Sequence, residues 1–497
     1  MMQRVPSRIG GLYSAVLLLV LGLVAGAAVA AEPNDPLYRS SGSWDQEFAD
    51  QWGLLQLRVY VPAARQAAVG VGRPVTVAVI DTGLDYEHPD LALSQLWRNE
   101  AETRNGRDDD GNGYVDDLIG WNFVDGNNNP WDLSGHGTHI AGTIAACTDN
   151  STGIAAVNPQ ARIMALKVAN FAGQARSSAV AAALYYAVAN GAQIINLSLG
   201  GELATELERE AAAHAEREGV LLVVSAGNRG VQADPNGYPG LPGALVVGAS
   251  GLDGDRAGFS GFGAALDVLA PGVDLLSLRA RDTDFIGLSE PLDYEAGAAT
   301  VGQDAAYYRA SGTSFAAAMV SGLASRLLSQ RPDLTRQQVR NLIEQTAIDV
   351  AAPGVDQLSG FGRVDFVRAL AGDPDLDVVA RLSGVTLALE NEQILLEIQG
   401  LVQATAFAGA SLSARQRQEV EPEEPEVDLA SLSKRERRRL EQEEKRRVRE
   451  AEKERRARQR RGEPEPIDPT VWQPLVAAIT KPDAEPLAGT LARVALD

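Results

Sequence analysis

Short apolar runs alternate with longer helical patterns between residues 75 and 329 of this 497-residue chain. Runs rich in β-branched residues are typical of buried strands, and the stretches between them have the composition of helices. Strands that alternate with helices form a parallel sheet covered on both faces. The sequence therefore predicts an α/β fold with a doubly wound, mostly parallel sheet. The predicted strands are 75–80, 163–168, 193–199, 220–225 and 244–248, and the predicted helices are 178–190, 204–218 and 315–329.

Four polar residues stand where these elements begin or end. Asp81 follows the first strand, Asn228 follows the fourth, and His136 lies between two glycines at the start of a helix. Ser314 stands among small residues that lead directly into an apolar helix. Open α/β sheets assemble their sites at strand ends, and a helix start offers unpaired N–H groups that can stabilise an oxyanion. We expect these four residues to meet in one site.

Each of these residues also has a purely structural interpretation. Asp81 would serve as a turn cap and Ser314 as a helix N-cap. His136 and His139 suggest a metal pair, but their spacing lacks the glutamate and the i, i+4 arrangement of a zinc protease helix. We interpret His139 and His88 as structural residues.

The motifs, taken together and in this order, resemble those of the subtilisin-like serine proteases, the subtilases. The resemblance extends from about residue 52 to residue 366 and includes the stretches 196–200, 238–240 and 267–272. One departure is Ala318, where the family usually has proline. Alanine restores a backbone donor and favours the helix, so this exchange leaves the predicted chemistry intact.

The resemblance implies a serine endopeptidase that acts on proteins or peptides. Ser314 would be the nucleophile, His136 the general base and then acid, and Asp81 the group that orients and stabilises the imidazole. Asn228 would donate its amide to the oxyanion beside the backbone N–H of Ser314. The alternative is a catalytically silent subtilase fold that binds peptides or acts as a scaffold.

The same resemblance implies where a substrate lies. The stretch 196–200 would offer its backbone to an extended peptide, which adds as a strand. This mode of binding fixes the register of the peptide with little regard to its sequence. The Tyr238-Pro239 peptide is expected to be cis and to shape the specificity pocket. The implied substrate-binding residues are Ser198, Leu199, Gly200, Ala226 and Gly227.

Acidic residues concentrate between positions 108 and 117. Oxygen ligands at alternate positions followed by a glycine match the first half of an EF-hand calcium loop. The distal glutamate is missing, because Ile119 occupies its position. We expect a structural calcium ion here, with a solvated acidic turn as the alternative. The expected ligands are Asp108, Asp110 and Asn112, with Asp116 or Asp117 closing the shell.

The N-terminus has the layout of a signal peptide over residues 1–31, with arginines before an apolar run and alanines after it. An uncleaved anchor is the alternative. The single cysteine excludes an internal disulfide, and the net charge of −21 argues against nucleic acid as the main partner. We expect an exported monomer whose catalytic domain covers residues 46–372. The stretch before it is too short for a folded pro-domain.

The chain changes character after residue 372. We expect a small segment at 373–415 with β character, a charged linker or helix at 416–469, and a tail at 470–497. Basic side chains outnumber acidic ones between residues 434 and 461, and the few apolar positions cannot sustain a coiled coil. A solvated segment is expected, with binding to an acidic surface as the alternative.

Overall fold

The computed structural model describes residues 32–61, 72–199, 203–283, 300–352 and 354–375, and five strands beyond them. The chain divides into two compact units, Met1–Arg381 and Leu382–Asp497. The predicted signal peptide, Gly200 and the charged segment 416–469 lie outside the described residues. Among the described helices, none is long and apolar enough to cross a membrane.

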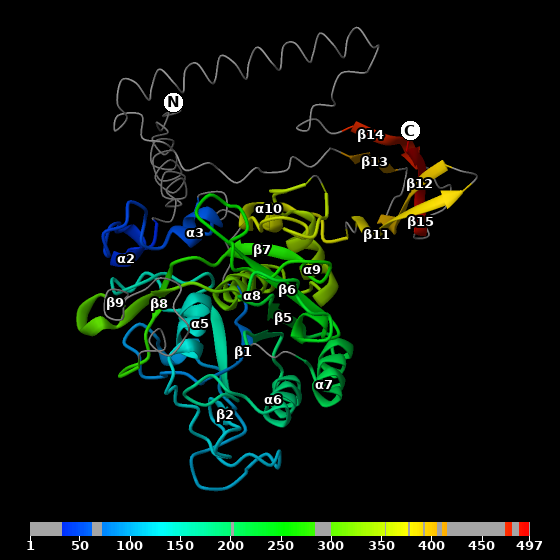
Figure 1. Ribbon diagram of the computed structural model, residues 1–497. Helices are drawn as coiled ribbons and strands as arrows, with labels where there is room; N and C mark the ends of the chain where they lie inside the picture. Colours follow the sequence, from blue (N-terminus) through cyan, green and yellow to red (C-terminus); the bar gives the residue numbers. More distant parts are fainter. Residues whose placement is uncertain are drawn as a thin grey trace, which may run out of the picture. The chain divides into compact units, whose positions relative to one another are not determined.

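A seven-stranded parallel sheet forms the centre of the first unit (Figure 1). The chain builds the sheet outward from β1, first to β3 on one side and then through β4 to β7 on the other. The predicted doubly wound fold is therefore confirmed, and the predicted strands and helices end within two residues of the observed ones. In spatial order the strands are β2 (Gly120–Asn122), β3 (Ala161–Lys167), β1 (Val75–Asp81), β4 (Ile194–Leu197), β5 (Leu221–Ser225), β6 (Ala244–Ser250) and β7 (Val268–Pro271).

Helices cover both faces of this sheet. Helices α5 (His136–Ala145) and α8 (Thr313–Gln330) pack on one face, and α6 (Ser177–Ala189) and α7 (Glu206–Arg217) pack on the other. Strand β1 shows why: Val75, Val77 and Val79 belong to one apolar core, and Ala78 and Ile80 belong to the other. Successive strand residues point to opposite faces, so an uninterrupted apolar strand needs a cover on each side.

Smaller elements complete the first unit. The start of α9 is a capping box in which Thr335 and Gln338 bind each other's backbone N–H, as Thr205 and Glu208 do at α7. The elements are α2 (Pro36–Arg39), α3 (Trp52–Gln56), η1 (Leu93–Gln95), η2 (Tyr238–Gly240), β8 (Leu275–Leu278), β9 (Thr300–Val301), η3 (Gln303–Ala305), β10 (Tyr307–Ala310), α9 (Arg336–Gln345) and α10 (Phe366–Ala371).

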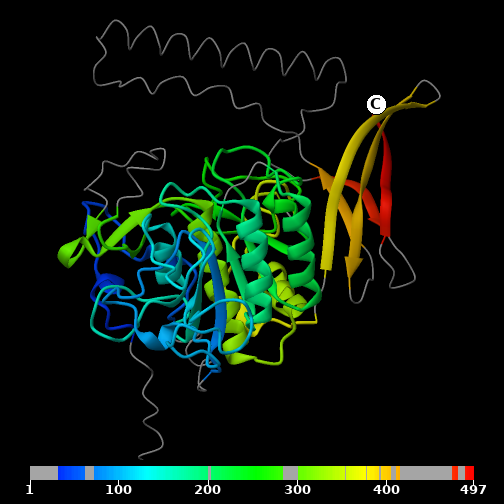
Figure 2. The same ribbon diagram turned by 90° about the horizontal axis from the view of Figure 1, so that it is seen from below.

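The remaining strands follow α10 (Figure 2). Strands β11 (Val378–Glu390), β12 (Gln393–Ala404) and β15 (Leu487–Leu496) form one sheet, and β13 (Ala410–Ala414) pairs with β14 (Gln473–Ile479). Strands β11 to β13 lie within the stretch 373–415. Strands β14 and β15 lie in the stretch 470–497, for which the sequence predicted no element.

Candidate active site

Asp81 and His136 meet where β1 ends and α5 begins. The Asp81 side chain is fully buried, and its Oδ1 atom lies 2.7 Å from Nδ1 of His136. The backbone N–H of Thr82 donates to the same oxygen at 2.7 Å. A proton held between Nδ1 and the carboxylate leaves Nε2 of the imidazole as the acceptor. The geometry is that of a histidine oriented to act as a base.

The surroundings of His136 favour its charged form. Burial lowers the pKa of the imidazole, but the charge and hydrogen bond of Asp81 outweigh burial, and Asp132 adds to the effect. The net result is a raised pKa. The site therefore stabilises the imidazolium that forms when His136 accepts a proton.

Ser314 is the second residue of α8 and is 7% exposed. Its Oγ donates to the carbonyl of Ser198 at 3.1 Å, and the Ser198 hydroxyl donates back to the carbonyl of Ser314 at 3.1 Å. The ring of Phe315 lies 5.4 Å from the ring of His136. The start of α8 is thus held between the end of β4 and the start of α5.

Asn228 lies beside the start of α8. Its Oδ1 accepts hydrogen bonds from both the backbone N–H and the hydroxyl of Thr313, each at 2.8 Å. The amide nitrogen therefore points away from Thr313, and a Cβ placed on Gly312 would lie 3.4 Å from it. An N–H donor consequently lies next to the backbone that precedes Ser314, where an oxyanion would need it.

The expected substrate-binding residues lie at the ends of two neighbouring strands. Ser198 and Leu199 follow β4, and Ala226 and Gly227 follow β5, which pairs with β4. Leu199 and Ala226 are buried, whereas Gly227 is exposed and has a φ of 95°.

The expected cis peptide at Tyr238-Pro239 is wrong, because no peptide bond in the described chain is cis. A trans bond is the preferred form by roughly 0.5–1 kcal/mol even before proline. It also suits the short helix η2, since the fixed φ of proline is tolerated in a first helical turn. The Tyr238 hydroxyl donates to the buried carboxylate of Glu208 at 2.7 Å, which anchors this turn to α7.

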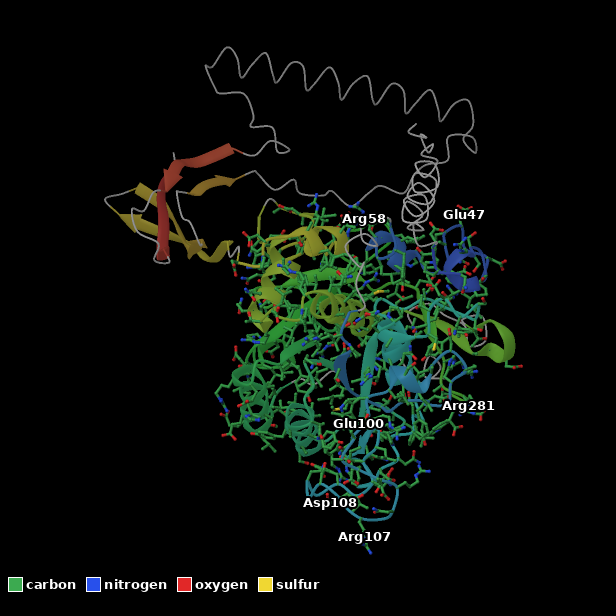
Figure 3. The ribbon with its side chains drawn as sticks, turned by 180° about the vertical axis from the view of Figure 1, so that it is seen from behind. Glu47, Arg58, Glu100, Arg107, Asp108 and Arg281 are labelled. Atoms are coloured by element: carbon green, nitrogen blue, oxygen red, sulfur yellow. The ribbon has the colours of Figure 1, made fainter. Side chains whose placement is uncertain are left out.

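The acidic segment that contains residues 102–117 forms a loop at the bottom of the view in Figure 3, where Arg107 and Asp108 are labelled. Carboxylate oxygens of Glu102, Asp108 and Asp110 lie within 4.8 Å of one another. Glu102 was not predicted from the sequence, because it precedes the alternating pattern; its burial and its place beside Asp108 and Asp110 are seen only in the structure.

The other expected ligands surround this group differently. Asn112 donates to both Asp110 and Asp117 at 3.1 Å. Asp117 is fully buried and also accepts from Asn99. Asp116 accepts from the backbone N–H groups of residues 105 and 106, so its carboxylate is engaged away from the three-carboxylate group.

His88 and His139 are structural, as predicted. Burial lowers both pKa values, that of His139 to about 3. Nε2 of His88 lies 2.9 Å from the carbonyl of Ala306, and Nε2 of His139 lies 3.1 Å from that of Leu275. Both rings are therefore neutral at physiological pH.

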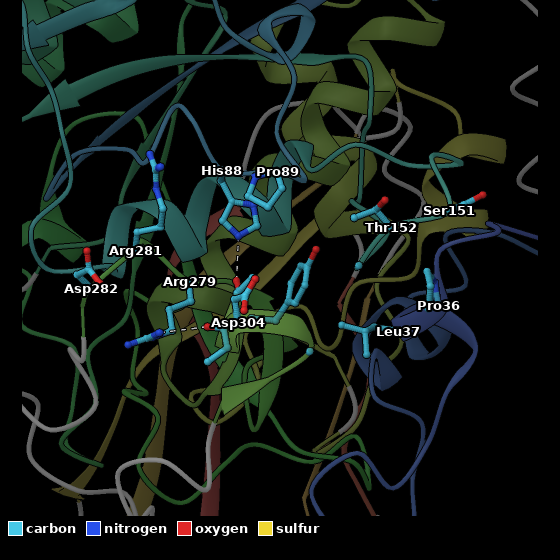
Figure 4. Close-up of a pocket in the computed structure, with 15 residues that line it drawn as sticks. Pro36, Leu37, His88, Pro89, Ser151, Thr152, Arg279, Arg281, Asp282 and Asp304 are labelled. Atoms are coloured by element: carbon cyan, nitrogen blue, oxygen red, sulfur yellow. Dashed lines mark hydrogen bonds between the residues drawn. The ribbon is translucent and has the colours of Figure 1, made fainter.

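A separate cavity of about 760 Å³ lies beside His88 (Figure 4). It is lined by segments of the chain that include none of the four proposed catalytic residues. Its cationic side chains are already engaged: Arg279 donates to two backbone carbonyls, and Arg281 pairs with Asp85 and Glu87. These contacts leave little to attract an anion.

The sequence analysis also missed Asp132, which lies four residues before His136 and is fully buried. Its partners lie after β1 and in the first turn of α5, so its role is visible only in the fold.

Known proteins resemble this chain in sequence. The model of the subtilase family matches residues 72–362, more than half of the chain. A thermophilic serine proteinase of Bacillus sp. (strain AK1) is 35% identical over 296 residues, which are 59% of this chain and 61% of that protein. Thermitase of Thermoactinomyces vulgaris is 32% identical over 339 residues, 68% of this chain and 99% of thermitase.

A more distant relative is the subtilisin-like protease 1 of Plasmodium berghei, 28% identical over 348 residues. The matched region is 57% of that protein. The chain thus spans nearly all of thermitase, but less than two thirds of the length of the Bacillus and Plasmodium proteins. The family match and the sheet topology agree. The chain belongs to the subtilase family of serine endopeptidases.

Proposed function

We propose that this chain is an exported serine endopeptidase that uses Asp81, His136 and Ser314 to hydrolyse peptide bonds. The observation that carries the proposal is the 2.7 Å contact between Nδ1 of His136 and the buried Asp81 carboxylate. That contact directs Nε2 toward a proton donor and compensates the charge the ring gains. Export is supported by the layout of residues 1–31.

The first half of the reaction forms an acyl-enzyme. The Ser314 hydroxyl turns from the Ser198 carbonyl to Nε2 of His136, which takes its proton as Oγ attacks the substrate carbonyl. Asn228 Nδ2 and the backbone N–H of Ser314 stabilise the resulting oxyanion. As the tetrahedral intermediate collapses, the C–N bond breaks and His136 passes its proton to the leaving amine.

The second half releases the product. Water attacks the ester carbon, His136 accepts a proton from it, and the same donors stabilise the second oxyanion. The C–O bond to Ser314 then breaks, and Oγ recovers its proton from His136. Asp81 remains ionised throughout and holds the ring.

The substrate is an extended stretch of protein or peptide. It would lie along the backbone of residues 198–200 and 226–227, at the ends of the paired strands β4 and β5. Contacts to a backbone are insensitive to sequence, so a broad specificity is expected.

The loop that contains residues 102–117 is the proposed site of a structural calcium ion. Calcium prefers several oxygen ligands, and three carboxylates so close together repel one another unless a cation neutralises them. Glu102, Asp108 and Asp110 would hold the ion, with the side chain of Asn112 or Asp117 completing the shell. The ion would stabilise the loop and takes no part in hydrolysis.

Peptide hydrolysis by single and double alanine variants of the triad tests the proposal. Because the three residues act as one unit, each single variant should lose nearly all activity and each double variant little more. Losses that simply add would contradict the assignment. A folded wild-type chain that cleaves no peptide in a diverse mixture would favour the catalytically silent subtilase fold.

A further inference from the structure

Asp132 is a fully buried carboxylate to which the proposed mechanism assigns no role. Its Oδ1 accepts from the Thr82 hydroxyl and from the backbone N–H groups of Ser134 and Gly135, each at 2.9 Å. Its Oδ2 accepts from the backbone N–H of Thr138 at 3.0 Å and from the Thr138 hydroxyl at 2.7 Å. An ionised carboxylate can only accept, and all five of these partners are donors.

These contacts replace a missing cap at the start of α5. The N-cap residue is Gly135, which has no side chain to bind the N–H groups of the first turn. Asp132 binds the N–H of Thr138, and the hydroxyl of Thr82 binds the N–H of Gly137 at 2.9 Å. The position of His136, the first residue of α5, therefore depends on two side chains outside the helix.

The same contacts connect α5 to the end of β1. Thr82 directly follows Asp81, donates to Asp132 and accepts from Gly137. The backbones are in close contact, since a Cβ on Gly137 would lie 2.3 Å from the carbonyl oxygen of Gly83. A shift of Asp132 would consequently move Asp81 and His136 relative to each other.

Asp132 also places a negative charge at this helix start. The positive end of a helix dipole disfavours an imidazolium at its first residue, and a nearby carboxylate offsets that effect. Charged groups near this helix start, among the described residues, include the buried Lys167 of β3, whose Nζ donates to two backbone carbonyls at 2.8 and 2.9 Å. Another is the buried Asp85, whose backbone N–H donates to the Thr138 hydroxyl and whose carboxylate pairs with Arg281. His139 on α5 is neutral. Burial lowers the pKa of His136, Asp81 raises it, and the charge of Asp132 adds to the effect of Asp81.

We propose that Asp132 is a positioning residue of the reaction, which fixes Asp81 and His136 relative to each other through Thr82. The inference rests on the proposed function of Asp81, His136 and Ser314. It adds a second buried carboxylate that acts through these residues without touching the substrate.

The first test compares Asp132→Asn with Asp267→Asn. Asp267 serves as a control, because it is also buried and accepts a backbone N–H, that of Val246 at 2.9 Å, but it pairs with Arg340 at 2.9 Å and directly precedes β7. Asp132→Asn should lower kcat about 10- to 100-fold, with little change in KM. This is the size of loss known when a residue that orients a functional side chain by hydrogen bonding is replaced. The acid limb of kcat/KM should move to lower pH, because a negative charge near His136 is lost. Asp267→Asn should leave the acid limb in place.

The second test separates geometry from charge with two variants of Thr82. Thr82→Val removes the hydroxyl between Asp132 and Gly137 but keeps the charge, so kcat should fall and the acid limb should not move. Thr82→Ser keeps the hydroxyl and should restore kcat. This pair decides the case if Asp132→Asn does not fold.

Labelling of the wild type by a fluorophosphonate separates a failure of the proposed function from a failure of the proposed role of Asp132. An unlabelled wild type would refute the proposed function. A labelled wild type would overturn the role of Asp132 alone in either of two cases: if Asp132→Asn keeps the wild-type kcat and acid limb, or if Thr82→Val and Thr82→Ser have equal kcat.

Discussion

At the scale of single residues, the chemistry depends on how three side chains are held. Asp81 is buried and shares its Oδ1 between His136 and the Thr82 N–H, while Asn228 is fixed at its oxygen end by Thr313. Each contact uses the part of the side chain that does not react. In the proposed mechanism the reacting atoms are Nε2 of His136 and Nδ2 of Asn228, and these contacts would orient them before substrate binds.

The raised pKa of His136 predicts the pH dependence of activity. The neutral ring is the base, so kcat/KM should fall as pH decreases through a value above the ordinary 6.5. Folding stability should respond in the opposite direction: a raised pKa contributes stability that is full below the unfolded value and is lost as pH rises through the folded one. A pH profile of kcat/KM measures the first effect, and an acid limb centred clearly below pH 6.5 would contradict it.

Replacement of Asn228 is expected to lower kcat and to leave KM nearly unchanged. Asn228→Ala should lower kcat by about 10²–10³ with little change in KM, the loss known for an oxyanion-hole asparagine of a subtilisin. Asn228→Asp should be as inactive, because it keeps the shape but donates no N–H. Asn190→Ala, at the end of α6, is the control and should match the wild type. An equal rise in KM with unchanged kcat would mean that Asn228 only binds substrate.

The sequence predicted these residues because each follows a strand or begins a helix with small neighbours. It could not predict Asp132 or Thr82 as partners of α5, because their role arises from a glycine N-cap that must be capped from outside the helix. The prediction of a cis peptide at Tyr238-Pro239 was wrong. It rested on the resemblance to the subtilases alone, and a trans bond fits the η2 turn.

At the scale of elements, apolar strands and helix starts were the most predictable features. Strand β1 is buried along nearly its whole length, which explains its run of β-branched residues. Strands β14 and β15 were not predicted because they pair with strands far away in sequence, and such pairing leaves only a weak local signal. The acidic loop was recognised, but Glu102 joins it only through the fold.

The acidic loop predicts a calcium-dependent melting temperature. An ion that binds only the folded chain stabilises it by roughly 2.7 kcal/mol at a hundred times its dissociation constant. Calcium should therefore raise the melting temperature relative to chelator, and Glu102→Gln or Asp110→Asn should reduce the difference. Glu218→Gln, an exposed acid after α7, should keep it in full. Equal calcium responses in the wild type and both loop variants would exclude this site.

At the scale of the whole molecule, packing of the first unit extends beyond the expected domain start at residue 46. Tyr38 is 5% exposed, and its ring meets that of Tyr60 edge to face at 5.4 Å. Trp44 donates to Asp274 at 3.1 Å. At the other end, Arg331 donates to the carbonyl of Gly372, close to the expected boundary. We therefore propose 32–375 as the catalytic unit.

Catalytic units that start at residue 32 and at residue 46 should differ in thermal stability. A fragment of residues 32–375 should fold and melt several degrees above a fragment of residues 46–375, which loses the burial of Tyr38. Thermal melts of both fragments and of the full chain measure the difference. Identical melting temperatures for the two fragments would show that residues 32–45 contribute nothing to stability.

The most direct test of the central claim is covalent labelling of the full chain by a fluorophosphonate, with the modified residue located by mass spectrometry. One label is expected, on Ser314, in the wild type and in the control Ser177→Ala, which changes the first residue of α6. No label is expected in Ser314→Ala, and a rate reduced by orders of magnitude is expected in His136→Ala, because the hydroxyl needs its base. A folded wild type that stays unlabelled, or a label that persists in Ser314→Ala, would contradict the central claim.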